Sequence, residues 1–211
     1  MATNDVEAAR GRPWVVPASA IGFAVLFVAG LLLSGEDNKN KTAEQVVKTF
    51  DDNKSWAIVG GYLLVVAGLA FLPLAWTVTK RVSAGLSPMG EQLARWSAVL
   101  FVAMVLVSGI LFATLAATVS FGAEDNPPAD LIRFVPQIGF GMVLLAGAFC
   151  ASLFLVLVSR AGQRTGAVPQ WFWILGYVAA VAMLAGVMFL PMVLLPIWAI
   201  GAAVVLRRQA T

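Results

Sequence analysis

Five long stretches that carry no charged residue constrain the fold of this chain more than any other feature. A helix needs roughly 20 apolar residues to cross a bilayer. Four stretches reach that length: Trp14–Ser34, Trp56–Thr79, Trp96–Phe121 and Phe134–Ser159. The composition agrees, since 60% of the residues are hydrophobic and 12% are charged, against about half and a quarter in soluble domains. We therefore expect an all-α fold, a polytopic transmembrane helical bundle.

The fifth stretch, Thr165–Leu206, is too long for one crossing at about 1.5 Å per residue. Arg207 and Arg208 follow it, and basic residues favour the cytoplasmic side, so the chain should pass out and back with a turn near Pro191. This predicts six spans, at about residues 14–34, 56–79, 96–121, 134–159, 171–187 and 191–206. The alternative is five spans, with one kinked helix at the end. Residues 14–208 form a single transmembrane domain between a cytoplasmic tail, 1–13, and a cytoplasmic end, 209–211.

Lysine and arginine residues near the span ends predict the orientation in the membrane. With a cytoplasmic N-terminus, nine of them lie inside and five lie outside. The nine are Arg10, Arg12, Lys80, Arg81, Arg95, Arg160, Arg164, Arg207 and Arg208, and the five are Lys39, Lys41, Lys48, Lys54 and Arg133. We therefore expect a multi-pass protein of the plasma (inner) membrane with both termini in the cytoplasm. A cleaved secretory signal is the alternative for the first stretch, which is longer than a usual signal core and lacks a small-residue cleavage site.

The longest hydrophilic piece between the apolar stretches, Thr42–Trp56, predicts a short amphipathic helix. Thr42 and Gln45 have the spacing of a capping box, in which each side chain bonds a free amide at the start of a helix. The apolar residues that follow recur at the spacing of one helical face: Ala43, Val46, Val47 and Phe50. We expect this helix to lie on the outer membrane surface, with Trp56 opening the second span at the interface.

The residue types needed for most catalytic and metal chemistry are missing from the sequence. There is no histidine, which is the commonest general base and the usual zinc or haem ligand. Cys150 is the only cysteine, so neither an intramolecular disulfide nor a thiolate metal cluster can form. The net charge of +3 comes from residues that flank spans without forming a patch, which gives no support for nucleic-acid binding. We expect no cofactor and no metal site.

A few polar residues inside the apolar stretches are candidate functional groups, namely Gln137, Tyr62 and Tyr177. Hydrogen bonding within or between helices is the structural alternative for each, and it is the role we expect for the other hydroxyls: Thr77, Ser108, Thr114, Thr118 and Ser152. No Asp, Glu, Lys or Arg lies within a predicted span, whereas ion-coupled transporters usually place ionisable groups at membrane depth. The sequence therefore argues against the movement of protons or metal cations.

Small residues spaced four apart allow close helix packing. The pairs are Gly147/Ala151, Ala148/Ser152, Gly176/Ala180 and Ala182/Gly186. Packing within the bundle accounts for all of them, and a face for a second copy of the chain or a membrane partner is the alternative. The tryptophans lie mostly near span ends, as in the aromatic belts of membrane proteins.

Three sequence pieces carry a resemblance to a known family. They are Thr42–Phe50 with the following 51–54, the turn Arg164–Trp171, and the pattern Leu190-Pro191…Leu195-Pro196-Ile197-Trp198. On these pieces the chain resembles small actinobacterial multi-spanning membrane proteins that carry a domain of unknown function. The resemblance implies a six-span bundle in the plasma membrane and assigns no activity to any residue.

Three classes of function remain open. The first, which we favour, is a non-enzymatic integral membrane protein that binds a partner, a lipid or a regulator. The second is a carrier or pore for an uncharged or lipidic small molecule, which needs a cavity lined by the third to fifth spans. The third is a membrane enzyme, which the absence of a recognisable acid, base or nucleophile constellation disfavours. The expected partners are the lipid bilayer and, in the first class, a second copy of the chain or another membrane protein.

Overall fold

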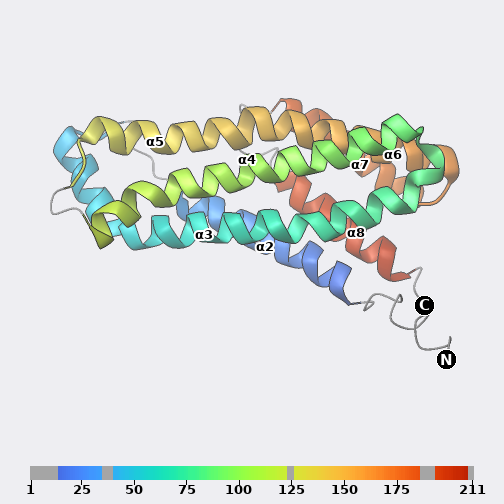
Figure 1. Ribbon diagram of the computed structural model, residues 1–211, viewed down its shortest axis with the longest axis horizontal. Helices are drawn as coiled ribbons and strands as arrows, with labels where there is room; N and C mark the ends of the chain where they lie inside the picture. The colour runs from blue at the N-terminus through green and yellow to red at the C-terminus, as the bar shows by residue number, and fades with distance from the viewer. Residues whose placement is uncertain (1–13, 35–39, 123–125, 186–192, 209–211) are drawn as a thin grey trace.

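The computed structural model describes residues 14–34, 40–122, 126–185 and 193–208. Within these ranges the chain is all-α, as predicted, and contains no strand. The helices lie side by side along one long axis and form a bundle (Figure 1). Their bounds are α2 Val15–Ser34, α3 Ala43–Val82, η1 Ser83–Gly85, α4 Pro88–Phe121, α5 Ala129–Gly141, η2 Met142–Gly147, α6 Ala148–Thr165, α7 Gln170–Leu184 and α8 Leu194–Arg208.

The described helices form six rods, which correspond to the six predicted spans. The fourth rod joins α5 and α6 through η2, a π-helical segment that follows one α-helix and precedes the next without a break. The rods of α2, α3, α4 and α5–α6 are long and apolar enough to cross a membrane, and α7 and α8 are shorter apolar helices. The predicted helical bundle is therefore confirmed.

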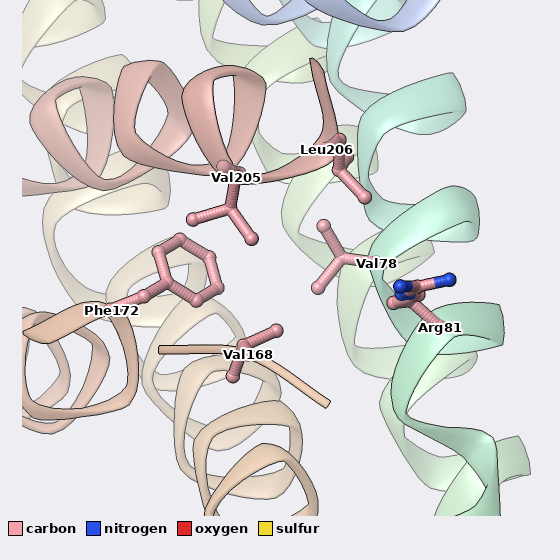
Figure 2. Close-up of a pocket in the computed structure, with 7 residues that line it drawn as sticks. Val78, Arg81, Val168, Phe172, Val205 and Leu206 are labelled. Atoms are coloured by element: carbon pink, nitrogen blue, oxygen red, sulfur yellow. The ribbon is translucent and has the colours of Figure 1, made fainter. Parts of the chain in front are cut away.

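The last two helices run in opposite directions. Val168, just before α7, and Phe172, in its first turn, line one crevice with Val205 and Leu206 near the end of α8 (Figure 2). The chain thus leaves one end of the bundle in α7 and returns to the same end in α8, which supports six spans over five. The turn predicted near Pro191 lies outside the described residues.

Helix α3 is the element on which its neighbours pack, and two adjacent glycines make this possible. A Cβ added at Gly60 would lie 3.0 Å from the carbonyl oxygen of Gly30 in α2, and one added at Gly61 would lie 2.3 Å from that of Gly109 in α4. Consecutive helical residues point about 100° apart because one turn takes 3.6 residues. The glycine pair therefore lets two helices approach the α3 backbone from two sides.

Aromatic side chains fill the middle of the bundle. Phe71 of α3 contacts the rings of Phe23, Phe101 and Phe154 at centroid distances of 4.8, 5.1 and 5.8 Å. The ring of Phe154 meets Trp198 of α8 edge to face at 5.7 Å. These rings belong to a core of buried residues that draws on α2, α3, α4, α6, α7 and α8. Such tilted and edge-to-face contacts add about 0.5–1.5 kcal/mol per pair to the burial of the rings.

The structure corrects the prediction of a separate helix on the membrane surface. The capping box is present, with Thr42 N donating to Gln45 Oε1 at 2.9 Å and Gln45 N donating to Thr42 Oγ1 at 3.3 Å. The helix that begins there joins the second span because neither glycine nor proline interrupts it before Gly60, and it continues through Pro73 to Val82. Its 40 residues extend about 60 Å, twice the roughly 30 Å of a hydrocarbon core. The first turns of α3 therefore project beyond the apolar part of the bundle instead of lying flat.

Candidate functional site

The projecting ends of three helices form a small helical cap, which we define as residues 43–55 of α3, 115–121 of α4 and 129–134 of α5. Its core consists of Val46, Phe50, Ala116 and Ile132, all buried. The cap lies at the end of the bundle where α3 begins, opposite the end where α2 begins and α8 ends (Figure 1). Of the predicted amphipathic face, Val46 and Phe50 are buried, Val47 is half-buried and Ala43 is exposed. Protein therefore covers the Val46 and Phe50 part of the apolar face, while Ala43 stays open to the surroundings.

A groove of about 480 Å³ opens on the cap beside this core. Helix α3 supplies most of its wall, and the chain leading into α5 supplies the rest. The lining residues are Ala43, Glu44, Val47, Lys48, Asp51, Asn126 and Ala129. The depression is shallow and open, and its lining combines apolar side chains with charged and amide groups.

Asp51 is an acidic residue in the lining of the groove, and it forms an ion pair with Lys54. Lys54 Nζ lies 2.7 Å from Asp51 Oδ1, one turn further along α3. The hydrogen bond from Lys54 and its positive charge hold the pKa of the Asp51 carboxyl below its ordinary value, although a smaller desolvation effect opposes them. Asp51 lies five residues before Trp56 and so outside the apolar part of α3. The carboxylate is ionised at neutral pH.

Arg133 ties two parts of the cap together. It belongs to α5, and its guanidinium donates to the backbone carbonyl of Lys41, just before the Thr42 cap of α3. Its buried Nε has no hydrogen-bond partner among the described residues. The contact joins positions 92 residues apart in the sequence. It therefore fixes the start of α3 relative to α5.

The three candidate polar residues of the sequence analysis are not brought together. Tyr62 is 69% exposed on the outside of α3, and Gln137 is exposed on α5. Tyr177 of α7 is half-buried, and its hydroxyl donates to Gln163 Oε1 of α6 at 3.3 Å. They lie on three different rods and define no common site.

The hydroxyls take the structural role that was predicted for them. Thr77, Thr114 and Thr118 each donate to a carbonyl of their own helix, four residues earlier. Ser108 of α4 donates to Gly139 of α5 at 2.8 Å, and Ser152 of α6 donates to Ala180 of α7 at 2.7 Å. The two serines therefore connect neighbouring rods.

The predicted Gly176/Ala180 pair packs inside the bundle. A Cβ added at Gly176 would lie 2.0 Å from Ser159 Oγ and 3.3 Å from Trp198 Nε1. Both polar atoms are buried without a hydrogen-bond partner among the described residues. Gly176 thus brings α7 against α6 and α8, and Gly186 of the predicted Ala182/Gly186 pair lies outside the described residues.

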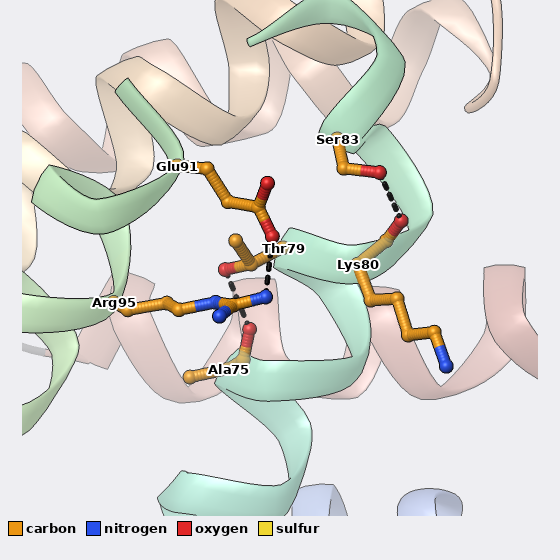
Figure 3. A network of polar contacts seen from close by, with 6 residues as sticks. All are labelled: Ala75, Thr79, Lys80, Ser83, Glu91 and Arg95. Atoms are coloured by element: carbon orange, nitrogen blue, oxygen red, sulfur yellow. Dashed lines mark hydrogen bonds and ion pairs between the residues drawn. The ribbon is translucent and has the colours of Figure 1, made fainter. Parts of the chain in front are cut away.

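The opposite end of the bundle, which we name the basic end, carries mostly positive side chains. The described ones are Lys80, Arg81, Arg95, Arg160, Arg164 and Arg207, with Glu91 as the acidic group. Glu91 pairs with Arg95, which lies one turn further along α4, and the Arg95 guanidinium also lies 4.2 Å from the centre of the Trp76 ring. Figure 3 shows this pair beside Thr79 and Ala75 of α3, with Lys80 directed away from it. The contact between Arg95 and Trp76 therefore ties α4 to α3 near the turn that joins them.

No group of three metal-binding side chains occurs within the described ranges. Sequence reasoning missed the groove on the cap and the crevice at the basic end, because each combines residues from separate helices.

Taken together, the fold and the apolar rods define an all-α helical bundle of the membrane class. Comparisons with protein-family models, with curated proteins and with solved structures find no match to the chain.

Proposed function

We infer that this chain is a non-enzymatic integral membrane protein that binds a partner protein through its cap. The observation that carries this proposal is the groove along α3. Its lining includes the apolar residues Ala43, Val47 and Ala129 together with acidic and basic side chains, and most of these residues belong to the continuous helix α3. A rigid helix presents such groups without the entropic cost of ordering a loop. These features support the binding of a partner protein at the groove.

The composition of the groove favours a protein segment as the occupant. The groove is open, and Glu44 and Lys48 add charges of both signs four residues apart along its edge. A segment that inserts an apolar side chain over Val47 and places polar groups beside the charges would complement it. The positive-inside rule places the basic end in the cytoplasm and the cap outside, so the partner would be met on the outer side of the plasma membrane. The partner is either another membrane protein or a second copy of the chain.

Site-specific photocrosslinking in intact cells tests the proposal. A photoreactive residue in place of Lys48 would lie in the groove, and one in place of Asp52 would lie on the same helix about 40° further round, outside the groove lining. We expect a discrete adduct from position 48 that a Val47→Asp change abolishes, and a weaker or absent adduct from position 52. An adduct of twice the chain mass would identify a second copy as the partner. No adduct from position 48, or equal adducts from both positions, would contradict the proposal.

A further inference from the structure

Gln137 is a polar side chain on the outward-facing side of the bundle. It is exposed on α5, and its amide forms no hydrogen bond with any residue that the structure describes. Figure 1 shows α5 along one edge of the bundle, where it packs mainly against α4 and α3. The exposed Thr114 and Thr118 of α4 differ, because each donates to a carbonyl of its own helix. The exposed amide of Gln137 therefore offers donors and an acceptor to a group outside the chain.

Two tryptophans of α3 mark the limits of the hydrocarbon core. Trp56 and Trp76 are both more than half exposed, and exposed tryptophans of transmembrane helices lie at the two interfaces. They are 20 residues apart on one helix, which corresponds to about 30 Å along its axis. This distance equals the usual thickness of the hydrocarbon core. The levels of Trp56 and Trp76 therefore serve as its two boundaries.

Contacts between α3, α4 and α5 place Gln137 inside these boundaries. Gly109 of α4 lies against residues 61–65 of α3, which are about 7.5–13.5 Å inside the boundary at the cap end. The neighbouring Ser108 donates to Gly139 of α5, so Gly139 is at a similar depth. Gln137 lies two residues, or about 3 Å, nearer the boundary. Its side chain therefore begins about 5–10 Å inside the hydrocarbon, where an unpaired polar group is unfavourable because lipid tails offer no hydrogen bond.

The helix face around Gln137 is open to the approach of another helix. Gly141 follows one turn later, and a Cβ added there would meet no atom within 4 Å. Phe134, one turn earlier, is exposed as well, so the three positions form one outward-facing strip. We name Phe134, Gln137 and Gly141 the α5 strip. A small residue on such a face lets helix backbones approach closely, and a polar side chain beside it adds interhelical hydrogen bonds.

We propose that the α5 strip is an interface between two copies of this chain in the membrane. All copies share one orientation in the bilayer, so Gln137 lies at the same depth in each. A carboxamide carries both NH₂ donors and a carbonyl acceptor, and two of them related by a two-fold axis exchange two hydrogen bonds. A partner of another sequence would need its own polar group at this depth, whereas a second copy supplies it. The α5 strip is separate from the groove on the cap, and the interface does not depend on the proposed function.

Energy transfer between two fluorophore-labelled populations of the full chain in liposomes, measured at increasing lipid dilution, tests this interface. We expect self-association, and Gln137→Leu should weaken it about tenfold, because two interhelical hydrogen bonds together contribute about 1.4 kcal/mol. Gln137→Asn keeps the carboxamide and should retain more association than Gln137→Leu. Tyr62→Phe is the matched control and should change nothing, because Tyr62 is a second exposed polar residue, six residues inside Trp56 on α3.

A second pair of variants tests the close approach of the two helices. Gly141→Leu fills the open position of the α5 strip and should weaken the association, whereas Gly22→Leu, at an equally open position of α2, should not. Both added side chains point into open space, so thermal unfolding in detergent should show that both variants keep or raise the Tm of the parent chain.

Absence of energy transfer at every dilution would overturn the proposal. Equal effects of Gln137→Leu and Tyr62→Phe, or of Gly141→Leu and Gly22→Leu, would also overturn it. Val47→Asp separates this interface from the groove on the cap and should leave the energy transfer unchanged. If Val47→Asp abolished the transfer while Gln137→Leu did not, the self-association would belong to the groove and the α5 strip would not be the interface.

Discussion

The cap and the membrane part of the bundle share the rods of α3 and α4 but are stabilised by different forces. In the cap, Val46 and Phe50 are buried against Ala116 and Ile132, with charged residues around them. Water surrounds such a region, so burial of apolar area drives its association. In the membrane part the surrounding lipid is as apolar as leucine, and burial provides little driving force between helices. Close backbone approach at Gly60 and Gly61 and interhelical serine bonds take its place there.

Because different forces hold them, the two regions should tolerate different substitutions. The cap should accept small changes of size and lose its structure when its core becomes polar. The membrane part should accept changes on its lipid-facing side and lose stability when an atom is added between two backbones.

The largest expected effect is all-or-none labelling, which would show on which side of the membrane each region lies. In a Cys150→Ser background, single cysteines at Lys48 and Asp130 should react with an impermeant thiol reagent in intact cells, because both are exposed on the cap side. Cysteines at Ser87 and Gln163, exposed at the basic end, should react only after the membrane is opened. Labelling of Ser87 in intact cells would reverse the proposed orientation.

The next effect concerns the cap alone. The double change Val46→Asp and Phe50→Asp places two charges in its core, and each buried apolar side chain contributes roughly 1.5–3 kcal/mol. We expect the first turns of α3 to lose their hydrogen-exchange protection in reconstituted protein, while residues after Trp56 keep theirs. A double change Glu44→Gln and Asp52→Asn on exposed positions is the control. Unchanged protection in the Asp variant would mean that something other than the small core holds the cap.

A smaller effect should follow from one added carbon in the membrane part. Gly61→Ala places a Cβ 2.3 Å from the carbonyl oxygen of Gly109, and overpacking of this kind costs about 1–3 kcal/mol. The matched control is Gly22→Ala in α2, where a Cβ would meet nothing within 4 Å. Thermal unfolding in detergent should show a lower Tm for Gly61→Ala and an unchanged or higher Tm for Gly22→Ala. Equal Tm values would mean that close approach at the glycine pair is not needed.

The smallest effect should come from the interhelical hydroxyls. Ser108→Ala removes the bond to Gly139, and Ser152→Ala removes the bond to Ala180. Hydrogen bonds between transmembrane helices contribute about 0.6 kcal/mol on average, so each change should lower the unfolding free energy by about that amount. Thr114→Val, which removes a bond within one helix, is the control and should have a smaller effect. If the serine variants lose no more unfolding free energy than Thr114→Val, the two serine hydrogen bonds do not help to hold neighbouring rods together.

Sequence reasoning worked best where a local pattern has one physical outcome. The uncharged stretches correctly predicted the apolar rods, and the spacing of Thr42 and Gln45 correctly predicted the capping box. It failed for the first turns of α3, because an apolar helical face looks the same whether lipid or another helix covers it. It also failed to rank Tyr62, Gln137 and Tyr177, since core-facing and lipid-facing sides of a transmembrane helix are both apolar and a polar residue could point either way.

The amino-acid sequence by itself determined the class of the fold, the six apolar rods and the absence of charge from their middle. These properties depend on residues within one helix turn or one apolar stretch, so they can be read without knowing the partners. Only the tertiary structure decided which protein surface covers Val46 and Phe50, which helices meet at Gly60 and Gly61, and that Gln137 lies on the exposed side of α5. Each of these depends on contacts between segments far apart in the chain, and such contacts are set by how whole helices pack together.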